Sequence, residues 1–197
     1  MSKFDVLDQL VKEGNGYLRT SLAMQNHVSR PTLADYARAR NMERVGNGLY
    51  LAADAWQDEL YQLHLLNSRI VFSHETALML LGLTEQEPSV ISVTVKAGYN
   101  ASHLRKQGIR VYQVKPEVYK LGVTQLKTVF GNPVCVYNRE RTICDILLCK
   151  NSMDIQIFRY AMKEYMAQKA KNLNRLMAYA KVFGIEDTVR LYTEVML

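Results

Sequence analysis

The strongest structural signal in this chain is an ordered series of three helices within its first 41 residues. Residues 4–12 repeat apolar side chains at the spacing of one buried helical stripe, and the Gly-Asn-Gly segment 14–16 ends that helix. A second, short helix is expected from Thr20 or Ser21 to Asn26, with Thr20 as its cap. A third runs from Ser29, a good N-cap followed by a proline that the first turn tolerates, to about Arg40 or Asn41.

A hairpin signal follows the third helix directly. Two short strand-like runs in residues 42–51 flank Gly46-Asn47-Gly48, and Asn-Gly is a strong hairpin signal because both of its turn positions favour positive φ. Three helices followed by a tight hairpin is the order of a winged helix-turn-helix. We therefore predict such a DNA-binding domain over residues 1–55, with the third helix in the major groove and the hairpin against the backbone or minor groove.

The side chains of these elements suit that interface. Ser29 and Thr32 are short hydroxyls near a helix N-terminus, where the dipole favours phosphate. Arg30 and Arg38 offer charge or a bidentate contact to guanine. The alternative is a small helical subdomain with a solvated face, because residues 1–55 hold seven basic and six acidic residues. The predicted DNA-contacting residues are Arg19, Ser29, Arg30, Thr32, Tyr36, Arg38, Arg40, Arg44 and Asn47.

Residues 56–197 predict a second domain in which strands and helices mix. The fold class is thus α+β: an N-terminal winged helix-turn-helix followed by a mixed α/β domain with a helical C-terminal cap. β-Branched runs predict strands, with 126–130 as a further candidate strand, and helical spacing returns from 139 onward. The expected strands are 90–95, 109–114 and 134–137, and the expected helices are 57–66, 73–82 (capped by Ser73 and ended by Gly82), 139–148 and a C-terminal group in which Gly184 ends one helix.

Charge is concentrated in this second part. The chain has a formal net charge of +6, and residues 96–141 alone contain nine basic residues against two acidic ones. Residues 155–181 contain six basic residues and one acidic residue. Such runs are either a solvated face or a nucleic-acid surface. The candidate basic face consists of Lys96, Arg105, Lys106, Arg110, Arg159 and Lys163.

Other classes of function find little support in the sequence. No apolar run approaches the roughly 20 residues that span a bilayer, and no signal peptide is recognisable, so a cytoplasmic location is expected. Cys135, Cys144 and Cys149 form no CxxC pair, which predicts free thiols and no metal site. Neither a Walker A loop nor GxGxxG is present, and no cofactor is expected.

We also expect no catalytic site. His74 and Glu75 are adjacent helical residues that point about 100° apart, so they do not easily share one site. A nucleophilic Cys144 would need a placed histidine, and the sequence suggests none. Asp145 lies four residues after Arg141, which predicts an ion pair within one helix.

Three segments in this order resemble the AbiEi family of bacterial antitoxins. They are residues 44–50 (RVGNGLY), 72–78 (FSHETAL) and 136–145 (VYNRERTICD), the last being similar to the family's Glu-Arg-Thr-x-x-Asp segment. The resemblance implies an autorepressor that binds inverted repeats in its own promoter. It also implies an antitoxin that counteracts a co-encoded nucleotidyltransferase toxin in phage abortive infection, without a stable complex between the two.

Three alternatives stay open. The first is an RNA-binding or tRNA-binding protein that shields the toxin's substrate, which the basic second part would suit. The second is an enzyme that reverses the toxin's modification, and the third is a module that binds another protein.

Overall fold

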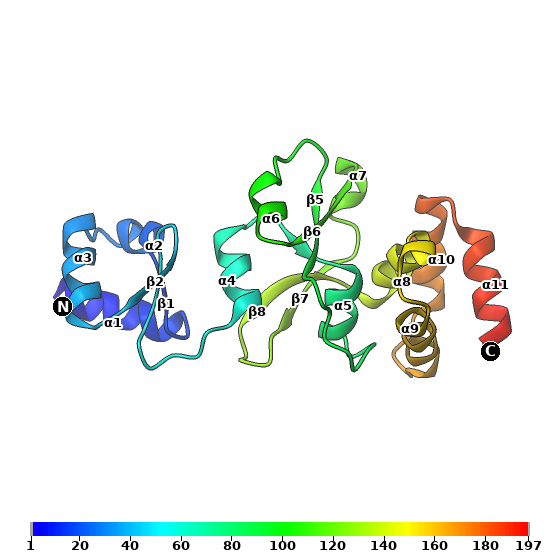
Figure 1. The fold of residues 1–197 in the computed structure, drawn as a ribbon, viewed down its shortest axis with the longest axis horizontal. Helices are drawn as coiled ribbons and strands as arrows, with labels where there is room; N and C mark the ends of the chain where they lie inside the picture. The colour runs from blue at the N-terminus through cyan, green and yellow to red at the C-terminus, as the bar shows by residue number, and fades with distance from the viewer. Residues whose placement is uncertain (1, 197) are drawn as a thin grey trace. The chain divides into compact units, whose positions relative to one another are not determined.

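A computed structural model of the protein describes residues 2–196, which divide into two compact units. Unit 1 extends to Ser68 and also includes Thr128–Asn132, and unit 2 consists of Arg69–Lys127 and Pro133–Leu197. The division therefore lies 13 residues beyond the predicted boundary after residue 55. Together the units have a mixed architecture of helices and two sheets, in agreement with the expected α+β class (Figure 1).

Unit 1 contains the three helices that the sequence predicts. They are α1 (Lys3–Glu13), α2 (Thr20–Gln25) and α3 (Arg30–Ala39). Ser29 caps α3 by accepting a hydrogen bond from the Thr32 amide at 3.3 Å, as expected of a serine at this position. The prediction that Thr20 caps α2 is wrong: Thr20 is the first helical residue, and the cap position is held by Arg19 without a side-chain hydrogen bond.

The sheet of unit 1 has three antiparallel strands in the order β1-β3-β2. The predicted hairpin is present as β2 (Glu43–Gly46) and β3 (Leu49–Leu51), while β1 (Tyr17–Arg19) is too short to show an alternating pattern and was not predicted. Among the described residues of the turn, only Gly48 adopts positive φ, at 67°. The expectation that Asn47 also does so is therefore wrong, because a register shift between Arg44 and Gly46 changes the twist entering the turn.

Helix α4 (Glu59–Leu66) belongs to unit 1 because it braces the hairpin. The Gln62 side chain donates to the Val45 carbonyl at 2.9 Å. A Cβ added to Gly46 would lie only 2.7 Å from the Leu66 side chain, so the helix and β2 are in close contact. The buried Asp58 caps α4 and accepts from the Thr128 hydroxyl and, at 2.8 Å, from the Asn132 amide. These contacts explain why the unit extends past residue 55 and takes in Thr128–Asn132.

The core of unit 1 lies between its helices. Leu7 and Leu10 of α1 pack with Leu33 and Tyr36 of α3, and Val28 from the α2–α3 turn joins them. A second cluster holds β1 against β3 through Tyr17, Leu49 and Leu51. The apolar stripe predicted for residues 4–12 is thus the one that α3 packs against.

Unit 2 is built on a five-stranded mixed sheet in the order β6-β5-β4-β8-β7. Neighbours β5 and β6 are parallel, as are β4 and β8, and the remaining pairs are antiparallel. The strand suggested at 126–130 lies instead at 123–127, because residues 128–132 turn away into unit 1. The strands are β4 (Val71–Phe72), β5 (Ser92–Lys96), β6 (Arg110–Val114), β7 (Val123–Lys127) and β8 (Pro133–Tyr137).

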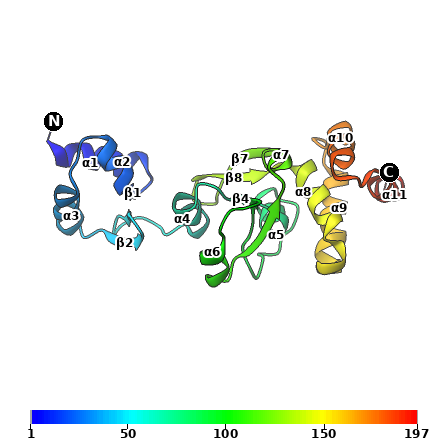
Figure 2. The same ribbon diagram turned by 90° about the horizontal axis from the view of Figure 1, so that it is seen from above.

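Helices α5, α6 and α7 lie between the strands in the chain, and the segment after the last strand is helical. Gly184, at φ 67°, ends α10 as predicted. Ser73 precedes α5 but makes no cap bond, since its hydroxyl accepts from Thr94 at 2.8 Å instead. Both views show α8 to α11 gathered together within unit 2 (Figures 1 and 2). The helices are α5 (His74–Leu80), α6 (Ser102–Lys106), α7 (Pro116–Tyr119), α8 (Arg139–Leu148), α9 (Ile155–Ala167), α10 (Leu173–Phe183) and α11 (Glu186–Met196).

Candidate nucleic-acid interface

The α2–turn–α3 segment is held in a compact helical hairpin by its turn. His27 adopts φ 58°, a left-handed conformation that a glycine more often supplies. Val28, the next residue, is 2% exposed and anchors the turn in the core. Three residues thus separate the end of α2 from the cap of α3. The sequence analysis did not single out Val28, although an apolar residue directly before a serine cap is a signal for such a turn.

Helix α3 has one buried face and one open face. Leu33, Tyr36 and Ala37 are buried, whereas Arg30 and Arg38 are exposed on the other side. The Arg38 side chain is 81% exposed and lies 3.4 Å from Asp35, a solvated pair that contributes little to stability. Arg38 can therefore exchange this partner for a phosphate or a base edge at small cost.

Two hydroxyls lie at the N-terminus of α3. The Ser29 and Thr32 oxygens are 2.8 Å apart, and Ser29 is exposed. Each oxygen keeps further hydrogen-bonding capacity, since a hydroxyl has one donor and two acceptor positions. The ten-residue helix also presents its positive dipole end here. This end of α3 therefore suits a phosphate oxygen.

Tyr36 is not part of the open face, and its assignment as a contact residue was wrong. The ring is 2% exposed, packs edge-on against Phe4 with ring centroids 5.1 Å apart, and donates its hydroxyl proton to Asp8 at 2.8 Å. Burial raises the pKa of Tyr36 to about 12, and the hydrogen bond to Asp8 adds to the rise. By helical spacing Tyr36 lies at the edge of the face formed by Leu33 and Ala37, and its contacts with Phe4 and Asp8 of α1 bury it.

Arg40 shares the same carboxylate. Its guanidinium lies 2.8 Å from Asp8, and the hydrogen bond and charge of Asp8 raise the pKa of Arg40. The side chain remains about half exposed, so Arg40 can face a phosphate only as part of this pair. Asp8, which the sequence analysis did not single out, positions both Tyr36 and Arg40.

The small sheet of unit 1 carries three of the predicted residues, with Arg19 at the end of β1 and Arg44 and Asn47 in the β2–β3 hairpin. Arg19, Arg44 and Asn47 are all exposed, and the Arg44 Nε donates to the Gly46 carbonyl at 3.4 Å. The Thr20 amide donates to the Gly48 carbonyl at 2.8 Å, which fixes the hairpin turn to the start of α2. The structure therefore brings eight of the nine predicted residues to the surface of unit 1 and places Tyr36 in the core.

The candidate basic face belongs to unit 2, where all six of its residues are exposed. Lys96 lines a cavity of about 340 Å³ with Arg69, and Arg159 and Lys163 line another of about 740 Å³. Arg105 and Lys106 lie on α6. Arg110 is paired with Glu75 at 2.8 Å. The predicted face is thus divided among several elements.

The charge of the two units differs in sign. Unit 1 holds seven Lys and Arg against eight Asp and Glu, whereas unit 2 holds 18 against 11. The positive balance of the chain therefore comes from unit 2. Any DNA contact by unit 1 depends on where its arginines lie and not on its total charge.

The structure places a histidine next to a cysteine, a pair that the sequence analysis did not predict. His74 Nε2 lies 3.6 Å from Cys149 Sγ, and its Nδ1 lies 3.0 Å from Ser73 Oγ. Burial, with the charges of Arg141 and Arg110, lowers the pKa of His74 to about 3, and burial raises the pKa of the Cys149 thiol. Both groups are thus neutral at pH 7, which is the opposite of the thiolate and imidazolium that activate a cysteine nucleophile.

His74 and Glu75 diverge as predicted. The His74 ring stacks on Tyr112 at 3.4 Å between centroids, while Glu75 accepts from Arg110 and from the Ser92 hydroxyl. Cys135, Cys144 and Cys149 are free. Among residues 2–196 no three metal-ligating side chains gather in one place.

The described helices also bear on membrane insertion. None of them, within residues 2–196, has both the length and the apolar character to cross a bilayer.

Comparison with known proteins identifies the fold but not a family. No protein-family model matches the chain, and no curated protein matches it. A solved structure, the crystal structure of the RV2827C protein from Mycobacterium tuberculosis, is similar at a TM-score of 0.62 and 11% sequence identity. The similarity covers 92% of this chain and 72% of that one. At this identity the likeness concerns the fold alone.

Proposed function

We propose that unit 1 is a winged helix-turn-helix that reads double-stranded DNA. The observation that carries the proposal is the open face of α3, where Arg30 and Arg38 are exposed, and the hairpin that follows it in the chain also exposes Arg44 and Asn47. A recognition helix needs this combination of a packed side and a free side that carries bidentate donors. The hairpin is braced by α4 and tied to α2, so it is a rigid wing.

On this basis, the resemblance to the AbiEi family supports a specific biological role. We propose that the protein is an autorepressor that binds inverted repeats in its own promoter, and an antitoxin against a co-encoded nucleotidyltransferase toxin in phage abortive infection. The proposed repressor acts in the cytoplasm and forms no stable complex with the toxin.

A binding experiment with two substitutions tests the DNA-binding proposal. Full-length protein is titrated against a labelled duplex of its own promoter, and fluorescence anisotropy is recorded. Arg38→Ala and Asn47→Ala should each weaken binding, by about 1–3 kcal/mol if the side chain contacts a base edge. Lys12→Ala, an exposed change on α1 away from α3's open face, is the matched control. Unchanged affinity for both wing and helix variants, with circular dichroism showing intact folding, would rule out this interface.

A second function is favoured by the charge of unit 2. Unit 2 has 18 basic residues against 11 acidic ones, and this positive charge suits a polyanion such as RNA. We propose as the alternative antitoxic mechanism that unit 2 binds RNA and shields the substrate of the toxin. Separate titrations with duplex promoter DNA and with single-stranded RNA distinguish the two functions, because Arg38→Ala should affect only the first.

A further inference from the structure

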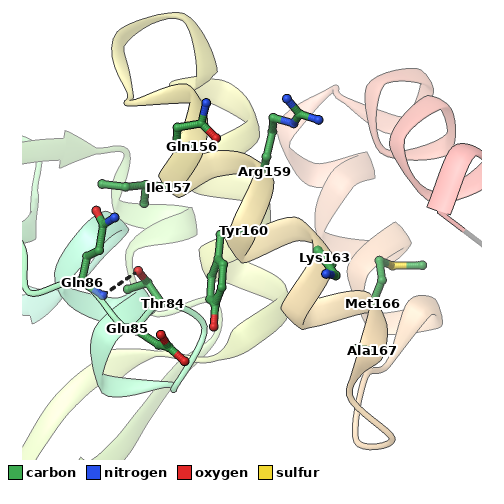
Figure 3. A pocket seen from close by; sticks show the side chains of 10 residues that line it. All are labelled: Thr84, Glu85, Gln86, Gln156, Ile157, Arg159, Tyr160, Lys163, Met166 and Ala167. Carbon is green, nitrogen blue, oxygen red and sulfur yellow. Dashed lines mark hydrogen bonds between the residues drawn. The ribbon is translucent and has the colours of Figure 1, made fainter.

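One cavity of unit 2 lies between two segments that are distant in the sequence. The loop Thr84–Gln86 forms one wall and the outer face of α9 forms the other (Figure 3). Its volume of about 740 Å³ is within the range of small-molecule sites. The backbone N–H of Gln86 donates to the Thr84 hydroxyl at 3.1 Å, which shapes the loop.

Helix spacing gathers the lining side chains of α9. Gln156, Tyr160 and Lys163 follow one another at intervals of four and three residues, which places them on one face of the helix, and Arg159 borders it. Tyr160 is 37% exposed although it is a large aromatic residue, so part of its ring is free. Figure 3 shows Tyr160 reaching from α9 toward the loop that carries Glu85.

The cavity carries opposite charges on its two walls. Arg159 and Lys163 are exposed cations on α9, while the loop contributes the carboxylate of Glu85. Desolvation raises the pKa of Tyr160, and the charges of Glu85 and Glu164 and a hydrogen bond to Glu85 add to the rise. Tyr160 thus shares its helix with both cations and extends across the cavity toward the loop that carries the carboxylate of Glu85.

This arrangement matches the chemistry of a nucleotide. Cations hold phosphate, an aromatic face stacks on a base, and a carboxylate accepts from an exocyclic base amine such as cytosine N4. The side-chain amides of Gln86 and Gln156 add donors and acceptors for a base edge. A duplex cannot use such a cavity, because its bases are already stacked and paired.

We propose that this cavity binds an unpaired nucleotide of single-stranded RNA, with its base on Tyr160, its phosphate at Arg159 and Lys163, and its amine at Glu85. The inference deepens the RNA-binding function proposed for unit 2, and it rests on that function. It does not depend on DNA binding by unit 1.

The test uses full-length protein and fluorescein-labelled eight-nucleotide RNAs of cytidine or uridine. Tyr160→Leu keeps an apolar side chain but removes the stacking ring, and should lower affinity for the cytidine RNA about tenfold. Lys163→Gln should reduce the slope of log affinity against log salt by about 0.7, the value for one phosphate on a single strand. The wild type should bind the cytidine RNA more tightly than the uridine RNA, because only cytosine has an amine for Glu85. Glu85→Gln should reduce this ratio of affinities. Lys181→Gln, the same change at an exposed site on α10 outside the cavity, should leave all three quantities unchanged.

The outcomes separate the site from the wider function. If the RNA binds but Tyr160→Leu and Lys163→Gln bind within twofold of the wild type, the cavity is not the site, although unit 2 can still be the RNA-binding part. If neither RNA binds, both the cavity proposal and the RNA-binding function fail. Affinity for promoter DNA, measured in parallel, should be the same in every cavity variant. That measurement tests only the DNA-binding function proposed for unit 1. Lys163 is exposed, so its variant keeps the test decisive even if Tyr160→Leu unfolds.

Discussion

The buried ion pair of unit 2 allows a stability prediction to be worked out from its contacts. Arg141 is fully buried, and its Nε donates to Asp145 at 2.9 Å. Its Nη1 donates to the Val118 and Leu121 carbonyls at 2.7 and 3.0 Å. The guanidinium also lies over the rings of Tyr137 and Phe183, 4.1 and 4.6 Å from their centroids. One side chain thus links α8 to α7, to the loop before β7, to β8 and to α10.

Arg141→Met should destabilise unit 2 substantially at neutral pH. Methionine preserves much of the apolar contact but leaves the carboxylate of Asp145, which is 5% exposed, without its counter-ion. Breaking a buried pair in this way typically costs about 3–5 kcal/mol. With a urea slope of roughly 2 kcal/mol per molar, the midpoint of unfolding should fall by about 2 M. Urea titrations followed by circular dichroism measure this shift.

The cost should depend on pH in a defined direction. Burial raises the pKa of Asp145 to about 6, and Arg141 opposes that rise. Because the folded pKa lies above the ordinary value of 3.8, the contribution of Asp145 to stability is greatest below about pH 4 and is lost as the pH rises through 6. Removing Arg141 should raise the pKa of Asp145 further, because Arg141 lowers it. The loss of stability in Arg141→Met should therefore be larger at pH 8 than at pH 5.

A double variant supplies the control. Arg141→Met with Asp145→Leu removes both charges and should be more stable at pH 8 than Arg141→Met alone, because no buried charge is left unpaired. If Arg141→Met lowers the free energy of unfolding by less than 1 kcal/mol, and equally at pH 5 and pH 8, then Asp145 does not depend on Arg141 as a buried counter-ion.

Three further predictions concern unit 1, each measured by thermal or urea unfolding. Asp8→Ala should cost about 1–3 kcal/mol, because the buried Tyr36 hydroxyl loses its acceptor, and equal stability of the variant and wild type would contradict this role. Gly48→Ala should cost about 1–2 kcal/mol, since its φ of 67° is strained for a side chain, and Gly48→Asn should cost less. Asp58→Ala should cost about 3 kcal/mol through loss of the α4 cap and of the acceptor for Thr128; a change within 0.5 kcal/mol would show that Asp58 does not join residues 128–132 to unit 1.

Local patterns in the sequence were sufficient for the elements whose signals are local. Helix α8 begins and ends where its spacing predicts, α3 has its serine cap, and Gly184 ends α10, because each depends on residues only a few positions apart. The Arg141–Asp145 pair was likewise predicted, since both partners lie one turn apart on the same helix. The composition also indicated that the basic residues concentrate in the second part of the chain.

Tertiary structure decided what depends on distant partners. Strand β1 exists because β3, more than 30 residues later, pairs with it, and α4 joins unit 1 because it packs on the hairpin. Tyr36 is buried, contrary to the predicted interface, because it contacts Asp8 and Phe4 of another helix. The cavity beside Tyr160 has walls about 75 residues apart. No local pattern encodes such pairings, because which distant residues meet is settled only when the buried faces of separate elements pack together.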